Sequence, residues 1–351
     1  MDQVAEKKGV CVPTFKDLGE FGFIDRIARH GLVREEGVLC GIGDDCAVFE
    51  LGEERALLVT ADLMVEEVHF RVAGTALEGL GYKLLAVNLS DVAAMGGEPR
   101  DAVVSAAIPA DFDAEYMERV YNGLHTCASR FGVNVAGGDT TRSPGPLVLN
   151  LTLTGEMARD RVRYRSGARP GDLVYVSGTL GDSAAGLKLA LGEDVGISEE
   201  DRAFLLRRHH RPEPRVALGQ ALAATGAVTA MIDLSDGAAS DLRHVCRQSG
   251  VGAVVAADAV PLSPALRAFC EATQTDPLCP ALSGGEDYEL LFTVDPERVR
   301  ALKAWEALPA VCPVGRIEAG EARIFLEGVE GGRKVLEGAG FDHFKAGCGE
   351  L

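Results

Sequence analysis

Residues Tyr82–Gly96 read YKLLAVNLSDVAAMG, an apolar segment that contains a single carboxylate. In the helix expected over Thr75–Met95, Leu80 and Leu84 lie on one apolar stripe at helical spacing. Asp91 follows Leu80 by eleven residues and therefore falls at the centre of that stripe. A buried carboxylate must be paired or must hold a metal ion, so this position predicts a functional acid. The alternative is an aspartate that accepts hydrogen bonds from backbone donors near the helix end.

Other aspartates stand at the ends of short apolar runs. They are Asp44 and Asp45 in Gly-Asp-Asp, Asp62 in Thr-Ala-Asp, Asp139 in Gly-Gly-Asp, and Asp233 and Asp236 in Asp-Leu-Ser-Asp-Gly. Two ionised carboxylates about 4 Å apart repel by roughly 4 kcal/mol at an effective dielectric of about 20. A fold that gathers several of them needs a cation, and without a His or Cys cluster Mg²⁺ is favoured. Mg²⁺ held in this way commonly binds substrate phosphates, which indicates phosphoryl transfer.

Each of these motifs also has a plainer interpretation. Asp236 or Ser235 is equally suited to capping the following helix, and a single Gly-Gly-Asp is weak evidence. The segment Gly178–Gly186 is better explained as a turn and helix start than as an anion site. His69 lies next to Phe70 in a short apolar stretch, where a histidine more often has a structural role than a binding role. The chain contains neither a Walker A loop nor a Gly-x-Gly-x-x-Gly fingerprint, so a nucleotide site here would lack a P-loop.

Length and composition favour a two-domain cytoplasmic protein. The 351 residues exceed one ordinary core, and helical and strand-like stretches mix in both halves, so the fold class is α/β (α+β). Residues 1–20 are polar and weakly patterned and are predicted to form an N-terminal arm. A loop rich in Arg, Gly and Pro (Arg159–Asp172) marks the boundary between an N-terminal domain (21–158) and a C-terminal α/β domain (159–351). Nine cysteines without a Cys-x-x-Cys pair, and no apolar span or signal peptide, predict reduced thiols in a cytoplasm. A net charge of −18 argues against nucleic acid or membrane partners.

Taken in order, the segments resemble the thiamine-monophosphate kinase family, of the superfamily named for aminoimidazole ribonucleotide synthetase. The matching segments are Gly41–Ala47, Tyr82–Gly96, Gly137–Arg142, Arg165–Asp172, Gly181–Gly186, Ile232–Gly237, Leu282–Leu290 and Gly340–Phe344. The resemblance covers about residues 18–345, which is nearly the whole chain. It implies ATP- and Mg²⁺-dependent conversion of thiamine monophosphate to thiamine diphosphate, the last step of thiamine diphosphate biosynthesis. It also implies a two-domain subunit of the superfamily's fold, paired into a homodimer through the sheet of its N-terminal domain.

The resemblance assigns expected roles by position. Several Mg²⁺ ions would be held by Asp45, Thr60, Asp62, Asp91, Asp139, Asp233 and Asp236. ATP, the co-substrate, would contact Gly138, Asp139, Arg165 and Ser235. Thiamine monophosphate would contact His69, Glu286 and Phe341. One departure stands out, because the serine–threonine pair expected before Asp62 reads Thr60-Ala61 here.

The implied chemistry agrees with the absence of a Ser/His/Asp or Cys/His arrangement. The acceptor would be a phosphate oxygen that is already ionised near pH 7, so no general base is needed and transfer is expected to be direct and in line. No residue is therefore predicted to act as acid, base or nucleophile. The alternatives are another ATP-dependent synthetase of the superfamily, or a non-catalytic scaffold that binds cations.

Overall fold

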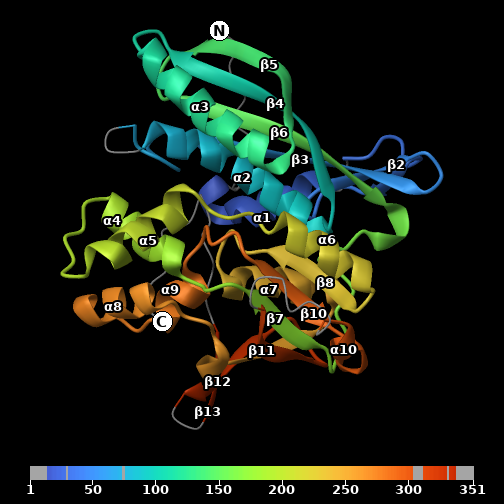
Figure 1. Ribbon diagram of the computed structural model, residues 1–351. Coiled ribbons are helices and arrows are strands. Elements are labelled where there is room, and N and C mark those ends of the chain that lie inside the picture. Colours follow the sequence, from blue (N-terminus) through green and yellow to red (C-terminus); the bar gives the residue numbers. More distant parts are fainter. Residues whose placement is uncertain (1–13, 29–30, 73–75, 303–310, 330–331, 337–351) are drawn as a thin grey trace, which may run out of the picture.

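The computed structural model describes residues 14–28, 31–72, 76–302, 311–329 and 332–336. Two sheets lie in two halves of the molecule, one above the other in the orientation of Figure 1. The upper sheet is built from residues up to 158 and the lower one from residues 173 onward. The mixture of helices and sheets in both halves confirms the predicted α/β (α+β) class.

In the described residues, the N-terminal sheet has six strands in the order β1-β2-β3-β6-β4-β5 and is antiparallel except for the parallel pair β4–β5. Its strands are β1 (Val38–Cys40), β2 (Ala47–Leu51), β3 (Arg55–Val65), β4 (Glu98–Pro109), β5 (Asn134–Ser143) and β6 (Val148–Ala158). The part of the C-terminal sheet that the structure describes has seven strands in the order β13-β12-β9-β11-β7-β10-β8. They are β7 (Leu173–Ser177), β8 (Val228–Asp233), β9 (Gly252–Ala256), β10 (Leu290–Val294), β11 (Val311–Glu318), β12 (Ile324–Val329) and β13 (Gly332–Val335).

The described helices fall into two groups. Those of the N-terminal half are α1 (Phe15–Ala28), α2 (Leu77–Met95) and α3 (Ala114–Phe131). Those of the C-terminal half are α4 (Asp182–Ala190), α5 (Glu199–His210), α6 (Val216–Thr225), α7 (Ala238–Ser249), α8 (Pro264–Thr273), α9 (Leu278–Ser283) and α10 (Val299–Leu302). No helix in the described ranges combines the length and apolar character that crossing a membrane requires.

Helix α2 is the element around which the two halves pack. It contacts β3, β6 and α3 on the N-terminal side and α6 and β8 on the C-terminal side. Within α2, every residue except Glu78 and Asp91 is buried. The single apolar stripe expected from the sequence is therefore wrong as a description, because partners on both sides bury the helix all round. Asp91 is partly exposed because it faces the cavity described below.

Two glycines let α2 and α3 approach closely. A Cβ added at Gly81 would come within 1.7 Å of the carbonyl oxygen of Val120, and one added at Gly123 would come within 1.8 Å of that of Glu78. Any side chain at either position would therefore push the helices apart. The close packing of α3 fixes the outer side of α2, so that Asp91 is held on a rigid support.

The predicted helices agree best with the structure where the sequence has a long run of helical periodicity with clear capping residues. The helices expected at Ala114–Phe131 and Ala238–Ser249 are α3 and α7 with the same bounds. Asp113 caps α3 by accepting a hydrogen bond from the Glu115 amide. The sequence did not predict α5, whose charged residues hide its periodicity. Helix α1 begins at Phe15, inside the segment predicted to be an arm.

Candidate active site

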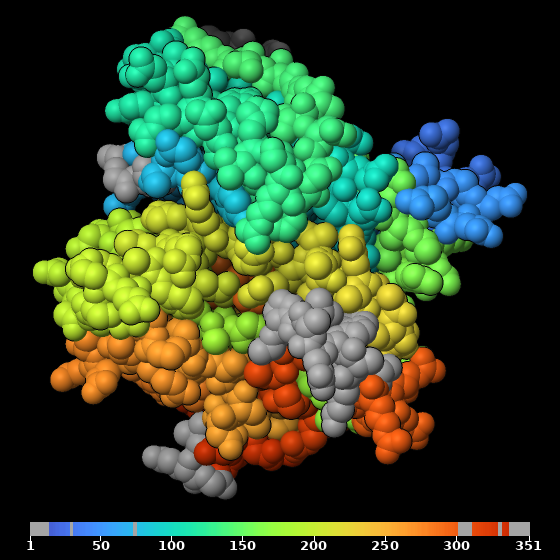
Figure 2. All heavy atoms as spheres, in the orientation of Figure 1, coloured from blue at the N-terminus to red at the C-terminus, as the bar shows by residue number. Residues whose placement is uncertain are grey.

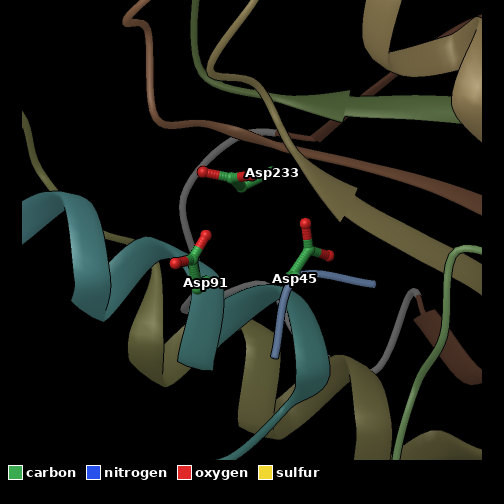
Figure 3. Close-up of side chains that lie close together, drawn as sticks. All are labelled: Asp45, Asp91 and Asp233. Carbon is green, nitrogen blue, oxygen red and sulfur yellow. The ribbon is translucent and has the colours of Figure 1, made fainter. Parts of the chain in front are cut away.

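Three carboxylates from three distant parts of the chain converge where the two halves meet (Figure 3). Asp91 comes from α2, Asp233 ends β8, and Asp45 precedes β2. One carboxylate oxygen from each lies within 4.8 Å of the others. Among the residues that the structure describes, these three aspartates are the group whose side-chain spacing suits a metal ion.

Hydroxyl groups and one guanidinium orient these carboxylates. The Thr60 hydroxyl donates to Asp91 Oδ2 at 2.5 Å, and the Ser90 hydroxyl donates to Asp233 Oδ2 at 2.7 Å. Arg165 donates to Asp45 Oδ1 from Nε at 3.0 Å and from Nη2 at 2.5 Å. The second oxygen of Asp45 is buried and has no hydrogen-bond partner among the residues that the structure describes. Since a buried carboxylate oxygen is costly without a partner, Asp45 Oδ2 marks an open ligand position.

The electrostatics indicate that Arg165 does not balance the negative charge of the cluster. Burial, and then the neighbouring charges of Asp62, Asp233 and Asp45, raise the pKa of Asp91 well above its usual value. Burial and the charge of Asp45 raise the pKa of Asp233 to about 8. Burial raises the pKa of Asp62 to about 6. Ionised carboxylates at this spacing repel by roughly 3–4 kcal/mol per pair at an effective dielectric of about 20, so a divalent cation would relieve the repulsion.

The cluster opens into a cavity of about 1620 Å³, which is lined by residues of both halves of the molecule. Figure 2 shows the N-terminal residues, in green and cyan, stacked on the C-terminal residues, in yellow to red. The volume exceeds that of a typical single-ligand pocket, about 300–1000 Å³, so the cavity has room for more than one ligand. Its wall includes Phe21 and Ile24 of α1, His244 of α7, and Glu286 from the loop before β10.

Comparison with known proteins places the chain in a family. The AIR synthase related protein N-terminal domain matches residues 43–157, and the corresponding C-terminal domain matches residues 169–326. The thiamine-monophosphate kinase of Salmonella typhimurium is 40% identical over 93% of this chain and 98% of its own length. That of Haemophilus influenzae is 38% identical over the same shares. The chain belongs to the thiamine-monophosphate kinase family.

A solved structure supports the same family at the level of the fold. "AaThiL complexed with AMPPCP and TMP" superposes with a TM-score of 0.83 at 37% identity, covering 95% of this chain and 99% of that one. A thiamine monophosphate kinase structure from Aquifex aeolicus gives a TM-score of 0.75 at 36% identity over 88% and 96%. The predicted family and the two-domain fold are therefore confirmed.

The structure brings together most of the residues to which the family resemblance gives a role. The cavity is lined by Asp45, Thr60, Asp62, His69, Asp91, Arg165, Asp233, Ser235, Asp236 and Glu286. The Nδ1 atom of His69 accepts a hydrogen bond from the Val65 amide at 3.0 Å, which leaves Nε2 to carry the ring proton. His69 therefore has the structural role allowed by the sequence, and it also lines the cavity.

Three predicted residues are not placed at the cluster. Gly138 and Asp139 lie on the exposed edge strand β5 and do not line the cavity of their own chain. Phe341 lies outside the described residues. The metal and ATP roles expected for Gly138 and Asp139, and the substrate role expected for Phe341, stay predictions.

Two acidic residues of the cavity wall were given no role from the sequence, although one of them, Asp44, was noted among the strand-end aspartates. Asp44 accepts a hydrogen bond from the Arg165 amide, at 3.1 Å to Oδ2, and burial together with the Asp45 charge raises its pKa to about 7. Asp241, in the first turn of α7, accepts from the Asp236 amide at 3.3 Å and is buried. Asp44 was visible in the Gly-Asp-Asp motif. Asp241 was signalled only by its place one turn after the Asp-Leu-Ser-Asp-Gly segment.

Proposed function

We propose that this chain transfers the γ-phosphoryl group of ATP to thiamine monophosphate, giving ADP and thiamine diphosphate. The convergence of Asp45, Asp91 and Asp233 in a cavity large enough for two phosphorylated substrates is the observation that carries the proposal. Its family members are named thiamine-monophosphate kinases, and AaThiL was solved with AMPPCP, an ATP analogue, and TMP. Both support this pair of substrates for the chain.

The residues at the cluster fit Mg²⁺. The available ligands are carboxylate oxygens, which hard cations prefer, and the buried Oδ2 of Asp45 has no hydrogen-bond partner in the described part of the chain. Asp45, Asp91 and Asp233 would hold the first ion, and Asp62 and Asp236 extend the acidic wall toward further ions. Bound Mg²⁺ would neutralise the phosphate oxygens between which the phosphoryl group moves.

The protein's own groups supply position rather than proton transfer. Thr60 and Ser90 fix the orientations of Asp91 and Asp233, and Arg165 holds Asp45. The backbone turn containing Ser235 lines the cavity next to the cluster. His69 and Glu286 line the same cavity and are proposed to contact the thiamine part of the acceptor. Because the acceptor phosphate is already ionised, transfer requires in-line alignment and no general base.

A direct assay tests the proposal. The protein should release ADP with ATP and thiamine monophosphate in the presence of Mg²⁺, and EDTA should abolish the reaction. Thiamine, which lacks the acceptor phosphate, should react far more slowly, and equal rates with thiamine would refute the proposed acceptor. ATP made chiral at its γ-phosphate should give product of inverted configuration. Retention, or label bound to the protein, would instead reveal a covalent intermediate.

The alternative functions predict different results in the same assay. A hydrogenase maturation protein, HypE, shares the fold with a TM-score of 0.66 at 22% identity, a level that shows the fold alone. Another synthetase of the superfamily would turn over ATP with aminoimidazole precursors and not with thiamine monophosphate. A scaffold that only binds cations would turn over neither. The identities of 34–40% to named thiamine-monophosphate kinases do not favour either alternative.

We also propose that the chain forms a homodimer through its N-terminal sheet. The boundary between its two domains is proposed to lie between residues 158 and 159, and the protein is proposed to be located in the cytoplasm. The apolar side chains of Leu63 on β3 and Val103 on β4 are 51% and 44% exposed, which supports a partner on this sheet. Asp139 could reach a carboxylate cluster only in a second copy of the chain, or in its own chain if β5 shifted. Light scattering should give twice the chain mass of 37.0 kDa, and a monomer at micromolar concentration would refute the dimer.

A further inference from the structure

Lys83 is a buried lysine in the middle of α2. Its side chain is 5% exposed, and Nζ lies 2.8 Å from Oε1 of Glu286 in the loop before β10. Lysine is almost never fully buried unless it is paired, so the contact calls for a reason. The ion pair joins the N-terminal half to the C-terminal half, because the two residues lie in different halves of the chain.

His209 of α5 contacts the other oxygen of the same carboxylate. Its Nδ1 lies 3.3 Å from Glu286 Oε2 and 3.2 Å from the Ser183 hydroxyl. Burial, and then the positive charge of Lys83, lower the pKa of His209 to about 3, so this ring is neutral near pH 7. Lys83 therefore supplies the positive charge. Burial alone would raise the pKa of Glu286, but the positive charge of Lys83 brings it below the usual value.

The backbone beneath Glu286 is held as firmly as its side chain. Glu286 has φ 66°, a left-handed conformation that is uncommon outside glycine, and its amide donates to the Ser235 carbonyl at 2.7 Å. A Cβ at Gly285 would come within 2.5 Å of the same Ser235 oxygen. The loop therefore lies tightly against the turn that carries Ser235 and Asp236, and this strained backbone directs the Glu286 side chain toward α2.

One helix links the two ends of the site. Lys83 and Asp91 are eight residues apart on α2, which is about 12 Å along the axis at 1.5 Å per residue. Asp91 belongs to the carboxylate cluster, whereas Lys83 reaches Glu286 from the protein interior and does not line the cavity. The rigid helix α2 thus sets the distance between the carboxylate cluster and Glu286.

We propose that Lys83 is a positioning residue: it holds Glu286 ionised and oriented to bind the cationic heteroaromatic part of thiamine monophosphate. The proposal rests on the proposed function, since it specifies how the same cavity recognises its acceptor. Lys83 acts through Glu286 and contacts no phosphate. Its loss should therefore weaken binding of thiamine monophosphate while the transfer step at the carboxylate cluster proceeds.

The test measures steady-state constants for the full-length protein with Mg²⁺ and ATP. Lys83→Met should raise the KM for thiamine monophosphate about tenfold, the size expected when a supporting partner of a binding group is lost. The kcat and the KM for ATP should change less than about twofold. Arg119→Met is the matched control: it removes a cation paired with Glu78 of the same helix, outside the cavity, and should leave all constants unchanged. A fall in kcat with an unchanged KM for thiamine monophosphate would overturn the proposal.

A double-mutant cycle shows whether Lys83 acts through Glu286. Adding Lys83→Met to Glu286→Gln should raise the KM no further, whereas a second tenfold rise would overturn the proposal. This comparison also serves if Lys83→Met alone unfolds, because the double variant leaves no unpaired charge buried. If wild-type protein releases no ADP with thiamine monophosphate, the proposed function itself fails. If it does, and Lys83→Met behaves like wild type, only the role of Lys83 fails.

Discussion

Asp233 and Glu289 are neighbouring buried carboxylates that the protein treats in opposite ways. Asp233 ends β8 and pairs in register with Leu290 of β10, and Glu289 is the residue before Leu290. The amide of Leu234 donates to the Glu289 carbonyl at 2.8 Å, so the two backbones are hydrogen bonded at this point. The exposed fractions are 2% for Asp233 and 0% for Glu289. Because the two carboxylates are almost equally buried, they differ mainly in the groups that pair with them.

Glu289 receives its positive charge from the chain itself. Arg215 donates to it at 2.6 and 2.5 Å, Arg208 donates at 3.0 Å, and the Ser177 hydroxyl donates at 2.5 Å. Burial alone would raise the pKa of Glu289, but the hydrogen bond from Arg215 and the charges of both arginines bring it below the usual value. This carboxylate is complete without any ligand.

Asp233 has a hydroxyl group where Glu289 has two guanidiniums. Ser90 donates one hydrogen bond to it, and burial together with the Asp45 charge raises its pKa to about 8. Two arginines pair with Glu289, whereas Asp233 lies next to the carboxylates of Asp45 and Asp91. The difference separates a charge that stabilises the fold from charges that await a cation from outside.

The largest expected effect is on activity, at the incomplete cluster. Asp91→Asn removes a proposed metal ligand and should lower kcat on the order of 10²–10³-fold at saturating Mg²⁺. The metal-free variant should melt no lower than wild type, because one source of repulsion has gone. Turnover measured by ADP release and melting by circular dichroism check both expectations. Near-normal turnover would show that Asp91 is an ordinary helix residue and would erase the contrast with Glu289.

The complementary variant should affect stability instead. Glu289→Gln leaves two arginines facing a neutral amide, and removing one partner of a buried ion pair typically lowers the free energy of unfolding by about 3–5 kcal/mol. Denaturant unfolding measures this loss, while kcat of the folded protein should stay within about twofold. Glu327→Gln, which breaks exposed pairs with Arg316 and Arg333, is the control and should leave stability nearly unchanged. A stable but inactive Glu289→Gln protein would contradict the structural role.

A smaller effect should appear in the pH dependence of the metal-free protein. Asp233 and Asp44, with pKa values of about 8 and about 7, keep protons between pH 6.5 and 8 that the unfolded chain has lost. The native state then binds more protons than the unfolded state, so stability falls as pH rises through this window. The buried His209 and His244, with pKa values lowered to about 3 and about 4, act in the opposite direction only below pH 6.5.

Thermal melts in EDTA measure this dependence. The Tm should fall between pH 6.5 and 8 by about 2–4 °C, the shift that 1 kcal/mol produces in domains of roughly 150–250 residues. Asp233→Asn should flatten the slope, and Mg²⁺ should raise the Tm most at the higher pH. A Tm that is level or rising across this window would mean that the cluster is already neutralised without metal.

The two sites also differ in how far the sequence predicts them. Asp45, Asp91 and Asp233 were identified because each carries a local signal, a carboxylate on or at the end of an apolar run. Nothing local pairs Glu289 with Arg208 and Arg215, since α5 was not predicted and the contacts cross more than 70 residues of chain.

Lys83 shows the same limit of sequence reasoning. It resembles any surface lysine of an amphipathic helix until packing on both sides buries α2. Strand ends and helix faces can be derived from periodicity, whereas long-range ion pairs depend on how the two halves dock.

The smallest expected effect concerns Ala61, where the chain departs from the family pattern. Side chains alternate along β3, and Thr60 is buried against Asp91 whereas Ala61 is exposed on the next position. A hydroxyl at position 61 would therefore start on the face opposite to Thr60 and Asp62. Ala61→Ser should change the Mg²⁺ concentration for half-maximal activity by less than about twofold, within the ±0.5 kcal/mol usual for surface substitutions. A fivefold lower requirement would show that the serine reaches the metal and that the ligand set around Asp91 was incomplete in this chain.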